Sequence, residues 1–192
     1  MRRLTFTTAL LASCLIALAL PEAAQTPAPA QAPSSLAPYV PTPQDVVDRM
    51  LALAGVTAND VVYDLGCGDG RIVITAAKKY GARGVGVDID PDRIKESEAN
   101  AKAAGVESRV SFRMQDALTV DVSPATVVTL YLLSSSNAKL RPTLTRQLRP
   151  GARIVSHAFG MGDWKPEKTE VFTDAGGTQR TLYRWVVDGT VR

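Results

Sequence analysis

From residue 39 onward, short apolar runs alternate with longer stretches in which apolar residues recur every three or four positions. The short runs predict strands and the longer periodic stretches predict helices. The predicted strands, the fifth with a turn at its start, occupy 61–63, 84–90, 110–114, 127–133 and 150–156. The predicted helices occupy 46–54, 71–79, 91–104 and 136–149. This alternation predicts an α/β fold with a mostly parallel sheet and helices on both faces.

The chain closes with two β-patterned runs, 170–173 and 181–187, joined by the glycine-containing segment 174–178. This spacing predicts an antiparallel hairpin at the end of the sheet. The run at 127–133 is apolar almost throughout, which suits a central strand covered on both faces. Open α/β sheets bind ligands beyond the carboxyl ends of their strands, so Tyr131 is a candidate site residue.

Capping residues mark the predicted helix boundaries. Thr42 is expected to cap the first helix, with Pro43 at its first position, and Gly55 ends that helix. Asp90 is expected to cap the helix that follows the second strand. Pro142 lies inside the fourth predicted helix, so we expect that helix to start or bend there.

The strand at 61–63 and the helix at 71–79 are joined by Asp64-Leu65-Gly66-Cys67-Gly68-Asp69-Gly70. Alternate glycines allow positive φ angles and a close approach of a ligand, and the helix N-terminus offers free N–H groups. The spacing is one residue short of the dinucleotide fingerprint, and Asp64 would repel a pyrophosphate but attract an ammonium. S-adenosyl-L-methionine (SAM) carries an ammonium, a sulfonium and no phosphate. The motif therefore predicts a SAM site, and the alternative is a glycine turn that only serves packing.

A second acid, Asp88, ends the second predicted strand, where nucleotide-binding folds place a carboxylate for the ribose hydroxyls. A carboxylate can accept both hydrogen bonds of a vicinal diol. Asp90 is explained as a helix cap, so Asp88 is the better ribose ligand. Ile89, between them, is expected to pack on the adenine.

At the glycine motif the chain resembles the class I SAM-dependent methyltransferases, whose first motif reads (D/E)-x-G-x-G-x-G. The resemblance covers about residues 39–187 and implies a Rossmann-like seven-strand sheet, SAM as the cofactor and methyl transfer as the reaction. It implies that Asp116 accepts a hydrogen bond from the adenine amino group. The alternative is an Asp that only stabilises a turn, where this residue type is common. Cys67 is then a small lining residue and not a catalytic thiol, because no Cys/His pairing motif surrounds it. The predicted cofactor-binding residues in this part of the chain are Asp64, Gly66, Cys67, Gly68, Gly70, Asp88, Ile89, Asp116 and Ala117.

A closer resemblance rests on the glycine motif, on Tyr39-Val40-Pro41-Thr42-Pro43 and on the loop Gly162-Asp163-Trp164. These segments are similar to those of a protein-lysine methyltransferase group that includes the ATP synthase c-subunit lysine methyltransferase and archaeal lysine methyltransferases. The resemblance implies that Tyr39, Pro41 and Thr42 belong to a lid over the cofactor, and that the acceptor is a protein lysine. An ordinary capped helix start would account for the same lead-in residues.

A lysine acceptor must be neutral, and desolvation in an apolar or aromatic channel promotes loss of its proton. Tyr39, Tyr131 and Trp164 are the catalytic candidates, because their rings can form such a channel and hold an ammonium by cation–π contact. Phe159 either joins them or packs in the core. The histidine that follows the fifth strand, His157, either bonds to backbone or takes part in proton transfer. No Asn-Pro-Pro-Tyr-like motif follows the fourth strand, which argues against nucleobase or glutamine amines as acceptors.

Composition adds few constraints. The 192 residues suit one domain plus a tail, and the net charge of +3 comes from Lys and Arg scattered among Asp and Glu. No basic stripe indicates a nucleic-acid partner. No Cys/His cluster has the spacing of a zinc site, so no metal is expected. The resemblance to lysine methyltransferases implies a protein substrate, and we expect the enzyme to be a monomer.

Residues 1–20 are typical of a signal peptide or an N-terminal anchor, with two arginines before an uncharged apolar run. Ala17-Leu18-Ala19 offers a cleavage site, and Cys14 lies in a segment that resembles a lipoprotein box. Residues 21–38 are rich in Pro and Ala and are expected to form a disordered linker. This leaves 39–192 as the methyltransferase domain.

The leader predicts export to the periplasm or the exterior, or membrane association, whereas SAM is made and kept in the cytoplasm. A leader that does not function would leave the protein cytoplasmic. Three functions stay open: a protein-lysine methyltransferase, a methyltransferase of a small molecule or RNA, and an exported, non-catalytic binding protein with the same fold. The acids Asp64, Asp88 and Asp116 favour an active site, whereas the leader favours the third function.

Overall fold

The computed structural model describes residues 35–192. The predicted leader, its Cys14 and the predicted linker up to residue 34 lie outside the described residues. The last four linker residues, 35–38, contact the domain: Ser136 Oγ donates to the carbonyl of Leu36 at 2.6 Å, and the Leu36 side chain packs on the core. Within the described part of the chain, no helix has the length and apolarity needed to cross a membrane.

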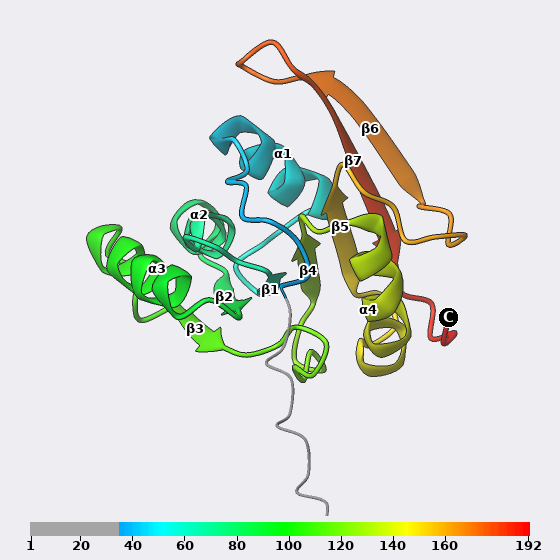
Figure 1. Ribbon diagram of the computed structural model, residues 1–192, viewed down its shortest axis with the longest axis horizontal. Helices are drawn as coiled ribbons and strands as arrows, with labels where there is room; N and C mark the ends of the chain where they lie inside the picture. Colours follow the sequence, from blue (N-terminus) through cyan, green and yellow to red (C-terminus); the bar gives the residue numbers. More distant parts are fainter. Residues whose placement is uncertain (1–34) are drawn as a thin grey trace, which may run out of the picture. The chain divides into compact units, whose positions relative to one another are not determined.

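Seven strands form one sheet in the order β3-β2-β1-β4-β5-β7-β6 (Figure 1). Strands β1 to β5 pair in parallel, and β6 and β7 form an antiparallel hairpin that joins the sheet beside β5. The strands are β1 Val61–Leu65, β2 Arg83–Asp88, β3 Val110–Met114, β4 Val127–Leu130, β5 Arg153–His157, β6 Lys168–Thr173 and β7 Gln179–Val186. This order confirms the predicted Rossmann-like fold with its closing hairpin. The strand order reverses between β1 and β4, which is where such sheets bind ligands.

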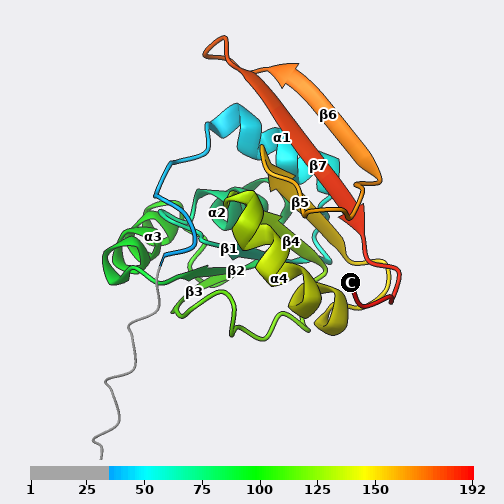
Figure 2. The same cartoon turned by 45° about the vertical axis from the view of Figure 1, so that its right-hand side comes forward.

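Helices cover both faces of the sheet. They are α1 Gln44–Ala54, α2 Arg71–Tyr80, α3 Pro91–Ala103 and α4 Ser134–Gln147. Helices α1, α2 and α3 supply one buried cluster, and α4 with the segment 117–125 supplies the other. Figure 2 shows α4 in front of the sheet. Neighbouring strand residues alternate between the two clusters, as Val62 and Tyr63 of β1 do.

Several boundaries differ from the prediction. Strand β4 ends at Leu130 and not at residue 133, because the chain turns there to enter α4 at Ser134. Helix α4 runs through Pro142, so it does not start at this proline, and of the two predicted alternatives a bend stays a prediction. Strand β2 ends at Asp88, and the next helix is capped as predicted by Asp90, whose side chain accepts from the backbone N–H two residues on.

Thr42 does not cap α1, contrary to the prediction. The N-cap is Pro43, the helix begins at Gln44, and no side chain caps it. Thr42 is instead buried, and its carbonyl accepts a 2.7 Å hydrogen bond from Arg71 Nη1, which draws this residue toward the glycine motif. The C-terminus of α1 is as predicted, because Gly55 adopts the left-handed conformation with φ 64°.

Candidate functional site

The turn between β1 and α2 has the backbone conformation that its glycines predict. Gly66, Gly68 and Gly70 have φ angles of 83°, 53° and 80°. A Cβ atom at Gly68 would lie 2.4 Å from the ring of Tyr39, and one at Gly70 would lie 2.7 Å from the ring of Phe112. The turn therefore requires glycine both for its φ angles and for its close contacts.

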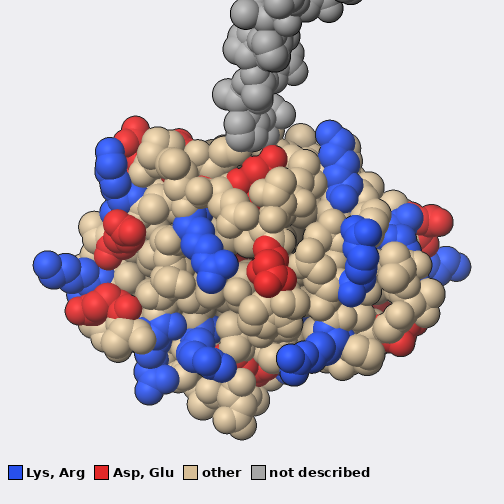
Figure 3. Space-filling model, turned by 90° about the horizontal axis from the view of Figure 1, so that it is seen from below, with Lys and Arg blue, Asp and Glu red and all other residues tan. Residues whose placement is uncertain are grey.

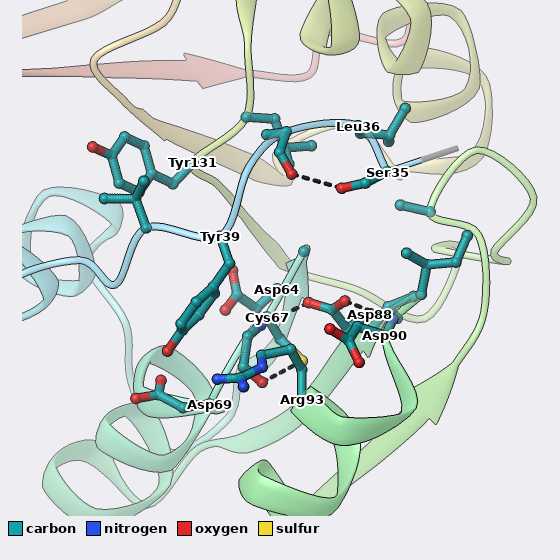
Figure 4. Close-up of a pocket in the computed structure, with 18 of the residues that line it drawn as sticks. Ser35, Leu36, Tyr39, Asp64, Cys67, Asp69, Asp88, Asp90, Arg93 and Tyr131 are labelled. Carbon is teal, nitrogen blue, oxygen red and sulfur yellow. Dashed lines mark hydrogen bonds between the residues drawn. The ribbon is translucent and has the colours of Figure 1, made fainter. Parts of the chain in front are cut away.

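A cavity of about 390 Å³ opens at the carboxyl ends of β1, β2 and β4 (Figure 4). The segment Ser35–Thr42, the glycine motif and the residues after β2, β3 and β4 line it. The predicted site residues in this lining are Tyr39, Pro41, Thr42, Asp64, Gly66, Cys67, Gly68, Asp88, Ile89, Asp116, Ala117 and Tyr131. Two predicted residues, Gly70 and Trp164, are not part of the lining.

The acidic end of the cavity is formed by Asp64, Asp88 and Asp116. Asp64 is buried, and its Oδ1 accepts a 2.8 Å hydrogen bond from Thr129 Oγ1 on β4. Burial, together with the negative charges of Asp88 and Asp69, raises the pKa of Asp64 to about 7 against the opposing effect of the Thr129 hydrogen bond. An ammonium that entered the cavity would favour the ionised carboxylate.

Asp88 is oriented by two backbone amides. Its Oδ2 accepts from the N–H of Gly68 at 2.9 Å, and its Oδ1 accepts from the N–H of Asp90 at 3.0 Å. Each carboxylate oxygen has a further lone pair, so the group can still accept hydrogen bonds from two neighbouring hydroxyls. The arrangement also ties the glycine motif to the start of α3.

Asp116 lies in the turn that follows β3. Its Oδ1 accepts from the N–H of Leu118 at 2.9 Å, and its carbonyl accepts from the N–H of Thr119 at 3.0 Å. The residue therefore stabilises a turn, as one of the two explanations from the sequence has it, and it also lines the cavity. Its contact with the adenine amino group stays a prediction. Ile89 and Ala117 add apolar lining to the same cavity. Their contact with an adenine stays a prediction.

The segment Ser35–Thr42 is held over the site by two arginines. The Arg93 guanidinium lies 4.5 Å from the centroid of the Tyr39 ring. Arg71 forms a 2.6 Å salt bridge with Asp69 and also donates to the last carbonyl of the segment. Sequence reasoning missed both arginines. The place of Arg71 directly after the glycine motif could have indicated it, whereas nothing in the sequence marks Arg93.

The aromatic end of the cavity is formed by Tyr131, on which pack two further rings that do not line the cavity themselves. Tyr131 follows β4 directly and lines the cavity. Its ring centroid lies 4.0 Å from that of His157 and 6.3 Å from that of Phe159. Trp164 packs elsewhere, 6.0 Å from the ring of Trp185, whose Nε1 donates to the Trp164 carbonyl at 2.8 Å. The structure therefore does not bring Trp164 into the predicted channel, because its loop turns back toward β7.

Two further side chains near the cavity have no reactive surroundings. The expectation that His157 bonds to backbone through its ring is wrong, because both ring nitrogens are buried without a hydrogen-bond partner. Cys67 is buried, and burial raises the pKa of its thiol, as suits a filler residue. Within residues 35–192 no group of three or more His, Cys, Asp or Glu side chains is placed to hold a metal ion.

The profile of the ANTKMT methyltransferase domain matches residues 64–168, from the first acid of the cavity to the start of β6. The chain belongs to this methyltransferase family. A protein-lysine N-methyltransferase of Saccharolobus islandicus is 47% identical to the ANTKMT-family chain over 151 residues, which cover 78% of this chain and 93% of the relative. The lysine N-methyltransferase of the ATP synthase c-subunit from Homo sapiens is 30% identical over 130 residues, which cover 68% of this chain and 55% of the relative.

A solved structure adds a bound ligand to the comparison. An RNA methyltransferase from Salinibacter ruber, crystallised with S-adenosyl-L-homocysteine (SAH), is 56% identical to the ANTKMT-family chain and has a TM-score of 0.74. The match covers 80% of this chain and 97% of that one. The ANTKMT-family protein is thus a class I SAM-dependent methyltransferase with SAM as its cofactor, as predicted. A non-catalytic binding function is not favoured.

Proposed function

We propose that this enzyme transfers a methyl group from SAM to the side-chain amine of a protein lysine. The observation that carries the proposal is the 47% identity to a relative named protein-lysine N-methyltransferase, along 93% of that relative. The aromatic end of the cavity supports it, because an amine acceptor needs surroundings in which it loses its proton.

The residues of the acidic end fit SAM. Asp64 would receive the ammonium, since it is a buried carboxyl group whose ionised form needs a cation. Asp88 would accept hydrogen bonds from the ribose hydroxyls, through the lone pairs that its bonds with the two backbone amides do not use. Ile89 and Asp116 would contact the adenine. When bound, SAM supplies an electrophilic methyl group on a sulfonium. The leaving group is a neutral thioether, so its departure needs no general acid.

The aromatic end would receive the lysine. Tyr131 lines the cavity directly after β4, whereas the Tyr39 ring lies at the glycine motif, where it contacts the Arg93 guanidinium. Aromatic faces attract an ammonium by cation–π contact, and exclusion of water from the same place favours the neutral amine. Fixed rings also restrict the amine to an in-line approach, which is what a displacement reaction requires.

RNA is the second candidate acceptor, because the Salinibacter ruber structure is named an RNA methyltransferase. Two observations favour lysine. On the face shown in Figure 3, Lys and Arg side chains are interspersed with Asp and Glu, and no basic stripe forms. The residues after β4 are Tyr131-Leu132-Leu133, without the polar Asn-Pro-Pro-Tyr-like motif common among enzymes that methylate nucleobase amines.

The test is an assay that identifies the methylated residue. The full-length chain is incubated with SAM tritiated at the methyl group and with a cell extract of the organism that encodes it, separated into protein and RNA fractions. We expect label that protease releases and nuclease does not, and methyl-lysine after acid hydrolysis. The Asp88→Ala variant should leave both fractions unlabelled. Label in methylated nucleosides alone would overturn the proposal in favour of RNA.

We further propose that the N-terminal leader directs export or membrane association, and that the protein is a monomer. Residues 1–20 carry the leader pattern, and their structure lies outside the described residues. Fractionation of cells and N-terminal sequencing of the mature protein test the leader. Light scattering during gel filtration tests the monomer, and a dimer mass would contradict it.

A further inference from the structure

His157 occupies a position that core packing does not explain. It is completely buried at the carboxyl end of β5, and both of its ring nitrogens lack a hydrogen-bond partner. Burial, aided by the Arg180 guanidinium and opposed by Asp174, lowers the pKa of this imidazole to about 4, so the ring is neutral. A buried polar group without partners is destabilising, whereas leucine or phenylalanine would fill the same space without that cost.

The contact that His157 does make with the site is from ring to ring. Its centroid lies 4.0 Å from that of Tyr131, and the two planes are 33° apart. Phe159 adds a second ring, 6.3 Å from Tyr131 and 29° from its plane. His157 and Phe159 do not line the cavity, whereas Tyr131 does. The lining tyrosine is therefore supported by two rings that come from one tripeptide.

That tripeptide is held in a strained turn. Ala158 has a φ of 65°, the one positive value at a non-glycine residue within the described chain. The N–H of Phe159 donates to the carbonyl of His157 at 2.8 Å, which closes a three-residue turn, and the N–H of Ala158 donates to the carbonyl of Thr181 on β7 at 2.8 Å. Turns of this kind persist only where the surroundings impose them, and they cluster at functional sites. Here the turn brings both rings to Tyr131.

We propose that His157 is a positioning residue for methyl transfer, whose ring holds Tyr131 in place at the aromatic end of the cavity together with Phe159. The inference rests on the proposed function, because it takes Tyr131 to face the acceptor amine. A neutral ring suits this role, since a charged one behind the tyrosine would repel an approaching ammonium. The unpaired nitrogens leave the ring face as the part of His157 that acts on the site.

The first test observes Tyr131 directly. The full-length chain, which has five tyrosines, is labelled with 3-fluorotyrosine and studied by fluorine NMR with SAH bound. Tyr131→Phe identifies the resonance. We expect His157→Leu to shift or broaden it and His157→Phe to restore it, because phenylalanine keeps a ring under the tyrosine. Tyr183→Leu, which removes a ring whose centroid lies 5.9 Å from that of Trp185, is the matched control and should leave the Tyr131 resonance unchanged.

The second test separates positioning from folding. We expect His157→Leu to lower turnover in the tritium assay about ten-fold, with SAH affinity within about two-fold of wild type, because misplacement of a reacting group impairs the transfer step and not cofactor binding. The melting temperature should not fall, since no hydrogen bond is lost. His157→Phe should recover most of the turnover.

Several results would overturn the inference. Wild-type turnover in His157→Leu would do so, as would a loss in His157→Phe equal to that in His157→Leu, because the nitrogens and not the ring would then matter. A parallel fall in SAH affinity would reduce the role to a structural one. If the label enters RNA and not lysine, the proposed acceptor fails, while the fluorine signal and the turnover of the variants still decide the positioning role.

Discussion

The two ends of the cavity are built on different physical principles. At the acidic end, directional hydrogen bonds fix each carboxylate: two backbone amides hold Asp88, and Thr129 holds Asp64. At the aromatic end, Tyr131 packs against the rings of His157 and Phe159, and neither ring nitrogen of His157 has a hydrogen-bond partner. One end presents carboxylates held by hydrogen bonds, whereas the other presents an aromatic ring held by neighbouring rings.

This difference implies a division of labour. Substitutions at the acidic end should act on cofactor affinity, because they remove charge-assisted hydrogen bonds. Substitutions at the aromatic end should act on turnover, because they loosen the placement of the acceptor without touching the cofactor.

Asp88→Ala should weaken SAH binding by at least about a hundred-fold, since hydrogen bonds to a charged group contribute about 1.5–3 kcal/mol each and two ribose hydroxyls lose their acceptor. Calorimetric titration measures the change. Asp92→Ala is the matched control. Asp92 is an acid in the first turn of α3, close to Asp88 in the sequence, but its side chain is 77% exposed and is paired only with Lys95. Equal losses in the two variants would show that charge near α3, and not the site, sets the affinity.

Tyr131→Leu should lower turnover about ten-fold and change SAH affinity by less than about two-fold, because the leucine loses the aromatic face but keeps the apolar volume. Initial rates in the tritium assay measure it. Trp164→Leu serves as the control, since Trp164 packs on Trp185 away from the cavity and its loss should affect stability and not turnover. A slower Trp164→Leu enzyme with an intact fold would contradict this placement.

The pH dependence of SAM binding should follow Asp64. Its pKa is raised to about 7, so at lower pH the carboxyl group is protonated and must release its proton before it can pair with the ammonium. Affinity should rise about five-fold between about pH 6 and pH 7, as the ionised fraction grows from roughly a tenth to a half, and should fall again at higher pH once the amino group of SAM loses its proton. Adenosine, which lacks that group, should bind equally at both pH values, and Asp64→Asn should remove the dependence. A flat profile for SAM in the wild type would exclude this pairing.

Cys67→Ala should have the smallest effect, with SAH affinity and turnover within about two-fold of wild type. The thiol is buried and its raised pKa keeps it protonated, so it provides volume and no reactive group. The same assays measure both quantities. A large loss of turnover with unchanged affinity would indicate a chemical role for the thiol.

The acidic end was predictable from the sequence because its residues fall in short local patterns. The glycine motif, the acid at the end of β2 and the capped start of α3 each depend on a strand, a turn and a helix that adjoin in the chain. The backbone follows directly, as the positive φ angles of Gly66, Gly68 and Gly70 show. The parallel sheet and the hairpin were predictable for the same reason, since alternating runs determine them.

The aromatic end was less predictable because it depends on contacts between distant segments. The strained turn at Ala158 is held by a hydrogen bond that its N–H donates to the Thr181 carbonyl on β7, and no residue type in the sequence indicates this turn. Trp164 was predicted beside the cavity from its place after β5, but packing on Trp185 takes it away. Thr42 was predicted to cap α1, but it does not do so, and its carbonyl accepts a hydrogen bond from Arg71 instead. Local propensity was overridden in each case by tertiary contacts.

The separation of the two ends is tested most directly by titrating SAH calorimetrically into the full-length wild type, Asp88→Ala and Tyr131→Leu side by side. We expect Asp88→Ala to bind SAH at least about a hundred-fold more weakly than wild type, and Tyr131→Leu to bind it within about two-fold of wild type despite its slower turnover. Loss of SAH binding in Tyr131→Leu, or wild-type binding in Asp88→Ala, would contradict it.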